Sequence, residues 1–167
     1  MLARGRPEGA SLLPASRAAA LRSFWVAGFC LPIFLLLDPA LTSGARSAVA
    51  ELTGYVAGWP AYALAALPLS RALGREALWP RFLIAWNWTN LFQYLIMLAI
   101  TLLSAIALPA WLQEAVTMVG IGYALWLQWF AARAALQVGG WFAVGFVVLD
   151  LLVSMLLSGI VTDLSRA

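Results

Sequence analysis

The stretch 141-WFAVGFVVLDLLVSMLLSGIV-161 decides the fold class of this 167-residue chain, because it carries a single charged residue, Asp150. About 20 predominantly apolar residues form a helix long enough to cross the hydrocarbon core of a bilayer. The whole chain is 64% hydrophobic and 10% charged, whereas soluble domains are about one quarter charged. Polar groups are too few to cover a soluble globule, so the chain is predicted to be an integral membrane protein.

The other predicted helices lie between the charged residues that flank long uncharged stretches. These stretches run from Arg22 to Asp38, Glu51 to Arg71, Arg81 to Glu114 and Glu114 to Arg133. Each is long enough for one crossing, and Pro109 is expected to end the third helix. The sequence therefore predicts an all-α polytopic bundle of five transmembrane helices, at about 20–40, 48–69, 82–108, 115–136 and 140–161.

The arginines indicate the orientation of the bundle. Arg4, Arg6, Arg17, Arg22, Arg71, Arg75, Arg81 and Arg133 would share one side, and Arg46 and Arg166 the other. Because short cytoplasmic loops are enriched in basic residues, the N-terminus is predicted to be cytoplasmic and the protein to lie in a bacterial inner membrane. The net charge of +3 then reflects topology and contact with the lipid bilayer, and no nucleic acid partner is expected.

Residues 1–17 form a separate segment in this prediction. They are rich in Arg, Pro, Gly and Ala and are expected to be a disordered basic cytoplasmic lead, followed by a single transmembrane helical domain over 18–167. One alternative is that the first helix is a signal peptide, with small residues at Ser43, Gly44 and Ala45 resembling a cleavage site. Asp38 and Pro39 interrupt the approach to that site, which favours a retained helix.

The residue inventory excludes several chemistries. The chain has no histidine and one cysteine, Cys30, so it has no Ser-His or Cys-His pair and cannot build a thiolate zinc or iron–sulfur site. A second aspartate at mid-depth, which an aspartyl protease needs, is also missing. No enzymatic activity, cofactor or metal is predicted.

Polar residues within the spans are the candidates for function, because polar groups are costly in hydrocarbon. Asp150, Gln93 and Gln128 are predicted to share one layer near the bilayer midplane. Such a layer either carries a proton or a cation, or holds three helices together through hydrogen bonds. The sequence leaves both interpretations open.

A second polar layer is predicted nearer the cytoplasm. Asn87 and Asn90 lie on one face of the third helix, and Arg133 ends the fourth helix at a similar depth. Arg133 either bonds these amides or extends its guanidinium to the lipid headgroups. Gly54 and Gly58 form the Gly-x-x-x-Gly pattern of closely packed membrane helices, which we interpret first as packing within the chain and second as dimerisation.

The segment RFLIAWNWTNLFQ (Arg81–Gln93), the five hydrophobic stretches and a proline-bearing first helix resemble bacterial Yip1-like membrane proteins. The resemblance covers about residues 20–161. It implies a five-helix bundle without an established enzymatic site.

Two functions are predicted. The first is a non-enzymatic membrane protein that acts through helix–helix interactions with a protein partner or with further copies of itself, as an accessory subunit or scaffold. The second is a small proton- or ion-coupled transporter or channel centred on Asp150 with Gln93 and Gln128. The second function requires a hydrated cavity.

Overall fold

The structure, a computed structural model, describes residues 5, 8–38, 44–106 and 108–166, which form helices joined by short turns, with no strand among them. The short helices are α1 (Glu8–Ser11), α2 (Arg17–Ser23) and the 3-10 turn η3 (Glu76–Leu78). The long helices are α3 (Trp25–Leu37), α4 (Ala45–Ala72), α5 (Trp79–Ser104), α6 (Ala110–Leu136) and α7 (Gly140–Arg166). Only Phe24 separates α2 from α3, so these two helices correspond to the first predicted span.

Four helical stretches within the described residues are long and apolar enough to cross a membrane. They are Arg17–Leu37, Glu76–Ser104, Ala110–Leu136 and Gly140–Arg166. The prediction of an all-α membrane protein is therefore confirmed at this level. The second predicted span, 48–69, is a continuous helix within α4, but its composition is more polar than that of the other four.

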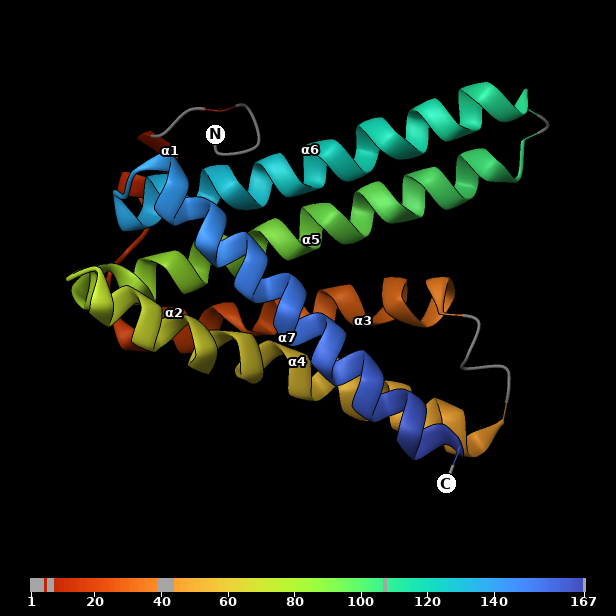
Figure 1. The fold of residues 1–167 in the computed structure, drawn as a ribbon, viewed down its shortest axis with the longest axis horizontal. Helices are drawn as coiled ribbons and strands as arrows, with labels where there is room; N and C mark the ends of the chain where they lie inside the picture. Colours follow the sequence, from red (N-terminus) through yellow and green to blue (C-terminus); the bar gives the residue numbers. More distant parts are fainter. Residues whose placement is uncertain (1–4, 6–7, 39–43, 107, 167) are drawn as a thin grey trace.

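The bundle consists of two antiparallel helix pairs with α3 between them (Figure 1). One pair is α5 and α6, and the other is α4 and α7; α5 also contacts α2 and α3, and α6 contacts α7. The two pairs lie close together where α4 leads into α5 and diverge towards the opposite end (Figure 1). Aromatic rings fill the closer end, where Phe82 packs on Phe146 with 5.1 Å between ring centroids.

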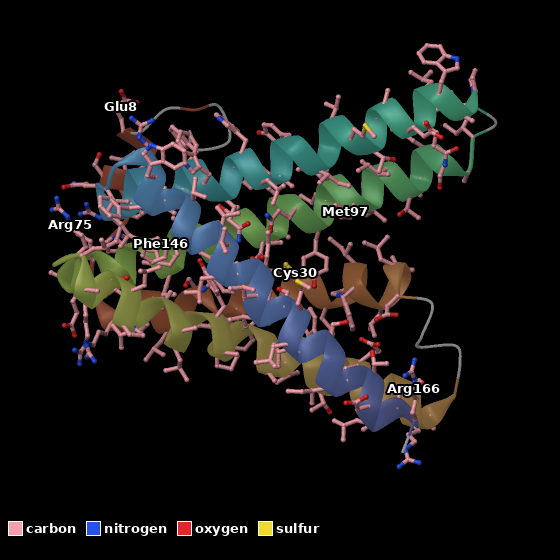
Figure 2. All side chains as sticks on the ribbon, viewed as in Figure 1. Glu8, Cys30, Arg75, Met97, Phe146 and Arg166 are labelled. Atoms are coloured by element: carbon pink, nitrogen blue, oxygen red, sulfur yellow. The ribbon has the colours of Figure 1, made fainter. Side chains whose placement is uncertain are left out.

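The outer surface of the bundle is apolar. Trp25, Met118, Trp141 and Met155 are among its exposed large side chains, and long side chains cover the outward faces of the helices (Figure 2). Charged side chains such as Arg75 and Arg166 lie at opposite ends of the molecule (Figure 2). This distribution is that of a protein surrounded by hydrocarbon with water at both ends.

The N-terminal lead differs from its predicted disorder over part of its length. Glu8–Ser11 forms one helical turn that contacts α6, with Gly9 and Ala10 buried. Arg81 fixes the segment that follows by donating from Nε to the Leu13 carbonyl oxygen, 3.2 Å away. The small side chains of Gly9 and Ala10 allow this close packing; residues 1–4 and 6–7 lie outside the described part of the chain.

The first membrane helix belongs to the packed bundle. Val26 and Cys30 of α3 are buried, and the Tyr55 hydroxyl of α4 donates to the Ala27 carbonyl oxygen across the interface. A chain cleaved as a signal peptide would lose these contacts. Ser43, at the predicted cleavage site, lies outside the described residues.

Candidate functional site

A cleft of about 260 Å³ lies between α3, α4, α5 and α7. Two acids, Glu51 and Asp150, contribute to its lining, and no arginine among the described residues does. We call it the acidic cleft. Its other lining residues are Phe34, Gly54, Tyr55, Gly58, Trp59, Tyr62, Trp86, Asn90, Tyr94, Val153, Ser154, Leu157, Ser158 and Val161.

The α4 wall of the cleft follows from helical spacing. Glu51, Tyr55, Gly58 and Tyr62 recur every three or four residues, so they share one face of the helix. Gly54 lies on the same face, where a methyl group in place of its hydrogen would come within 2.5 Å of the Val161 side chain of α7. The two glycines thus serve as packing positions within the chain, and α7 occupies the ridge that they form.

Asp150 lies near the middle of α7 and is half-buried. Its carboxylate accepts a hydrogen bond from Nε2 of Gln128 on α6, at 2.5 Å. Gln128 is only 3% exposed, so it holds the carboxylate from the protein side. The structure therefore brings together two of the three residues predicted for the midplane layer, at the inner end of an acidic cleft.

Gln93, the third residue of that predicted layer, bonds elsewhere. Its Nε2 donates to the Ala124 carbonyl oxygen of α6 at 3.3 Å, one helical turn before Gln128. Gln93 is absent from the cleft lining. Its amide ties α5 to α6 and does not join the carboxylate, because the α5 face that carries Gln93 is turned towards α6.

The predicted cytoplasmic layer separates into three environments. Asn87 is fully buried and donates from Nδ2 to the Ser23 hydroxyl of α2 at 2.6 Å. Asn90 lines the acidic cleft and donates to the Trp86 carbonyl oxygen of its own helix. Arg133 is exposed, and its guanidinium lies 5.3 Å from the centre of the Trp129 ring. This position matches an arginine that extends to the headgroups better than one that bonds the two asparagines.

Two buried polar atoms have no hydrogen-bond partner within the described residues: the indole nitrogen of Trp86 and Oδ1 of Asn87. Trp86 is 5% exposed and lines the acidic cleft. An unpaired buried N–H costs about 1–3 kcal/mol. The indole N–H is itself covered by neighbouring atoms, so Trp86 contributes its ring, and not this donor, to the cleft wall.

Aromatic rings form much of the cleft wall. The Phe34 and Tyr55 rings stack with centroids 4.5 Å apart, and the Trp59 ring meets the Trp86 ring edge-on at 5.6 Å. Tyr62 packs on Trp86 at 4.5 Å and donates from its hydroxyl to the Phe146 carbonyl oxygen. Because Phe146 lies one helical turn before Asp150, this bond fixes α7 beside the aromatic wall.

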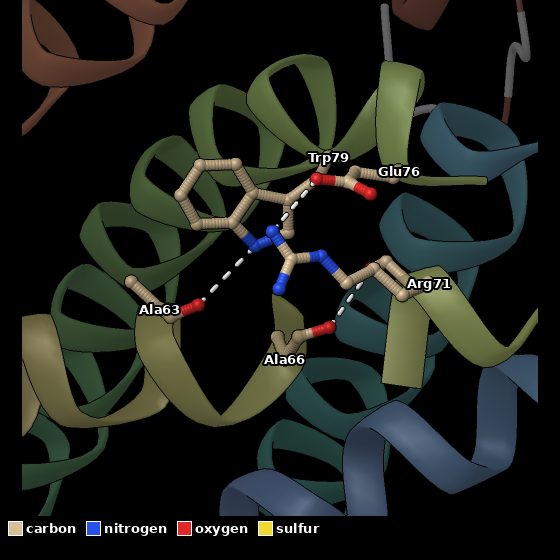
Figure 3. Close-up of polar contacts among 6 residues, drawn as sticks. Ala63, Ala66, Arg71, Glu76 and Trp79 are labelled. Atoms are coloured by element: carbon tan, nitrogen blue, oxygen red, sulfur yellow. Dashed lines mark hydrogen bonds and ion pairs between the residues drawn. The ribbon is translucent and has the colours of Figure 1, made fainter. Parts of the chain in front are cut away.

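A second groove, of about 510 Å³, lies near the N-terminus of α2. Its lining is mostly apolar, with Arg17, Arg71 and Glu76 as the charged residues. Arg71 is bound to Glu76 by an ion pair of 2.9 Å, and the Trp79 indole donates to the Ala63 carbonyl oxygen beside it (Figure 3). The ion pair neutralises Arg71 within the groove. The two acids of the acidic cleft have no basic partner among its described lining residues, so the acidic cleft is the stronger candidate site.

Several cleft residues were not predicted from the sequence as site residues. Glu51, Tyr55 and Trp86 are among them. The available signal was the shared face of Glu51, Gly54, Tyr55, Gly58 and Tyr62. The matching small residues of α7, Ser154 and Ser158, gave a second signal.

Comparison with protein-family models, curated proteins and solved structures gives no match for this chain. The resemblance of Arg81–Gln93 to Yip1-like proteins therefore stays a prediction. The functional proposal below rests on the acidic cleft alone.

Proposed function

We propose that this chain is a five-span inner-membrane protein, with a cytoplasmic N-terminus, that works as a small proton- or cation-coupled carrier. The observation that carries the proposal is the half-buried Asp150 carboxylate at the inner end of the acidic cleft. A carboxylate near the bilayer midplane is costly unless it binds a proton, a cation or a basic side chain. Within the described lining of the cleft there is no basic side chain.

The proposal counts α4 as the fifth membrane span. At 1.5 Å per residue its 28 residues extend about 42 Å, which is enough to cross a bilayer. The low hydropathy of α4 reflects the residues that it turns towards the cleft. Its opposite face exposes apolar side chains, with Val49, Val56 and Leu64 each more than 60% exposed, and this face suits lipid contact.

The other predicted function, an accessory subunit or an oligomeric scaffold, relied on the small-residue ridge of Gly54 and Gly58. Within this chain α7 covers that ridge. The ridge is therefore unavailable to a partner helix, and the carrier is the better supported function. We propose no enzymatic activity, since the sequence has no histidine and therefore no Ser-His or Cys-His pair.

The test is cation flux through purified protein in liposomes. Full-length chain would be reconstituted, and the movement of protons, Na⁺ and K⁺ would be recorded separately with ion-sensitive dyes. We expect flux of at least one of these ions that falls at least tenfold in Asp150→Asn. Asp163→Asn is the matched control, because Asp163 lies on the same helix outside the cleft lining and should leave the flux unchanged.

Two results would overturn the carrier function. One is the absence of flux above that of empty liposomes for all three ions. The other is wild-type flux in Asp150→Asn. Both variants would first be compared with wild type by gel filtration in mild detergent, so that a loss of flux is not a loss of folding.

A further inference from the structure

We propose that the acidic cleft binds a small organic ammonium compound. This inference rests on the proposed carrier function and names its cargo. Two features of the cleft support it: negative charge without a basic side chain in the described lining, and aromatic walls.

The charge of the cleft selects a cation. Glu51 and Asp150 both contribute to the lining. Gln128 donates to the Asp150 carboxylate through an uncharged amide, so it supplies no counterion. Arg46 lies on the same helix as Glu51, yet it donates to the Leu164 carbonyl oxygen and is absent from the lining. A ligand with positive charge would therefore supply the missing counterion.

The walls of the cleft select an organic cation over a metal ion. Within the described residues no cluster of acids and cysteines could coordinate a metal. Instead, the cleft presents the rings of Tyr55, Trp59, Trp86 and Tyr94, and ring faces attract alkylammonium groups through cation–π interactions. A volume of about 260 Å³ is ample for such a group, since a cavity of about 150 Å³ holds benzene.

Choline and two of its analogues separate these contributions. Tetramethylammonium keeps the charge and lacks the oxygen, whereas 3,3-dimethyl-1-butanol keeps the shape and the oxygen and lacks the charge. Binding to the full-length protein in mild detergent would be measured by calorimetry, with tryptophan fluorescence as a second readout. We expect choline and tetramethylammonium to bind with similar affinity, and both at least tenfold more tightly than the neutral analogue.

Variants assign each preference to a residue. Asp150→Asn should remove the advantage of choline over the neutral alcohol. Trp86→Phe, which retains an aromatic ring of weaker cation–π attraction, should weaken the binding of choline and of tetramethylammonium by a similar factor. Asp163→Asn should bind all three compounds as the wild type does.

Equal binding of the neutral alcohol and choline would overturn the inference, and so would displacement of choline by millimolar Na⁺. If choline does not bind but Asp150-dependent proton or Na⁺ flux is present, the carrier function stands and the organic cargo is wrong. If choline binds but none of the three ions moves, with or without choline in the assay, the cleft is a binding site and the coupled carrier function is wrong.

Discussion

Substituting Gly54 with alanine should destabilise the α4–α7 pair, whereas the same change at Gly58 should not. Both glycines lie on the same face of α4, one helical turn apart, so each substitution gains the same helix propensity of about 1 kcal/mol. A methyl group at Gly58 would lie 3.7 Å from Leu157, an ordinary contact. At Gly54 it would lie 2.5 Å from Cγ2 of Val161, so the side chain of Val161 must move.

The cost at Gly54 follows from the stiffness of Val161. Valine in a helix strongly prefers one rotamer, and Val161 is 5% exposed, so its methyl group has little room to turn away. Overpacking of this kind costs about 1–3 kcal/mol. We expect Gly58→Ala to be neutral or stabilising by up to about 1 kcal/mol, and Gly54→Ala to be less stable than Gly58→Ala by about 1–3 kcal/mol.

The assay is unfolding of the purified variants in mixed detergent micelles, followed by circular dichroism. Val161→Ala removes the clashing methyl group. In the double variant Gly54→Ala with Val161→Ala, the two effects should therefore be strongly non-additive, with a favourable coupling of about 1–3 kcal/mol. Equal stability of Gly54→Ala and Gly58→Ala, or purely additive effects in the double variant, would refute the close contact between α4 and α7.

Two further predictions test the interior and the topology. Ser23→Ala should destabilise the protein by about 1–2 kcal/mol, because Asn87 then has neither polar side-chain atom bonded. Adding Asn87→Leu should recover most of that loss, since replacing both partners by apolar groups is nearly neutral. No recovery in the unfolding assay would contradict this account. Reporter fusions after Gly44 and within 71–81 should lie on opposite sides of the membrane, and the same side for both would exclude α4 as a span.

The sequence was sufficient to predict the helices because the relevant signals are local. Each of the five predicted helices corresponds to helical structure, with ends that differ by a few residues. The third helix ends at Ser104 instead of reaching 108, and the fourth begins at Ala110 instead of 115. Apolar length predicts that a helix exists, whereas its ends depend on capping and on turn contacts between neighbours.

The site was only partly predictable, because depth along a helix does not fix the direction in which a side chain points. Asp150, Gln93 and Gln128 were placed at one depth. Whether Gln93 faces Asp150 or Ala124 depends on the rotation of α5 against α6, and the sequence does not contain that angle. Glu51 joins the cleft for a similar reason, since only the pairing of α4 with α7 places Glu51 and Asp150 in the same lining.

The pairing of α4 with α7 also has a consequence for biosynthesis. In the growing chain α4 leaves the ribosome before α7, and α5 and α6 are made in between. During that interval Glu51 and the two glycines have no covering helix, so α4, the least hydrophobic of the long helices, must be retained by the insertion machinery or remain loosely placed until α7 is made. A nascent chain that stops after α6 should therefore be a preferred substrate for membrane quality-control proteases.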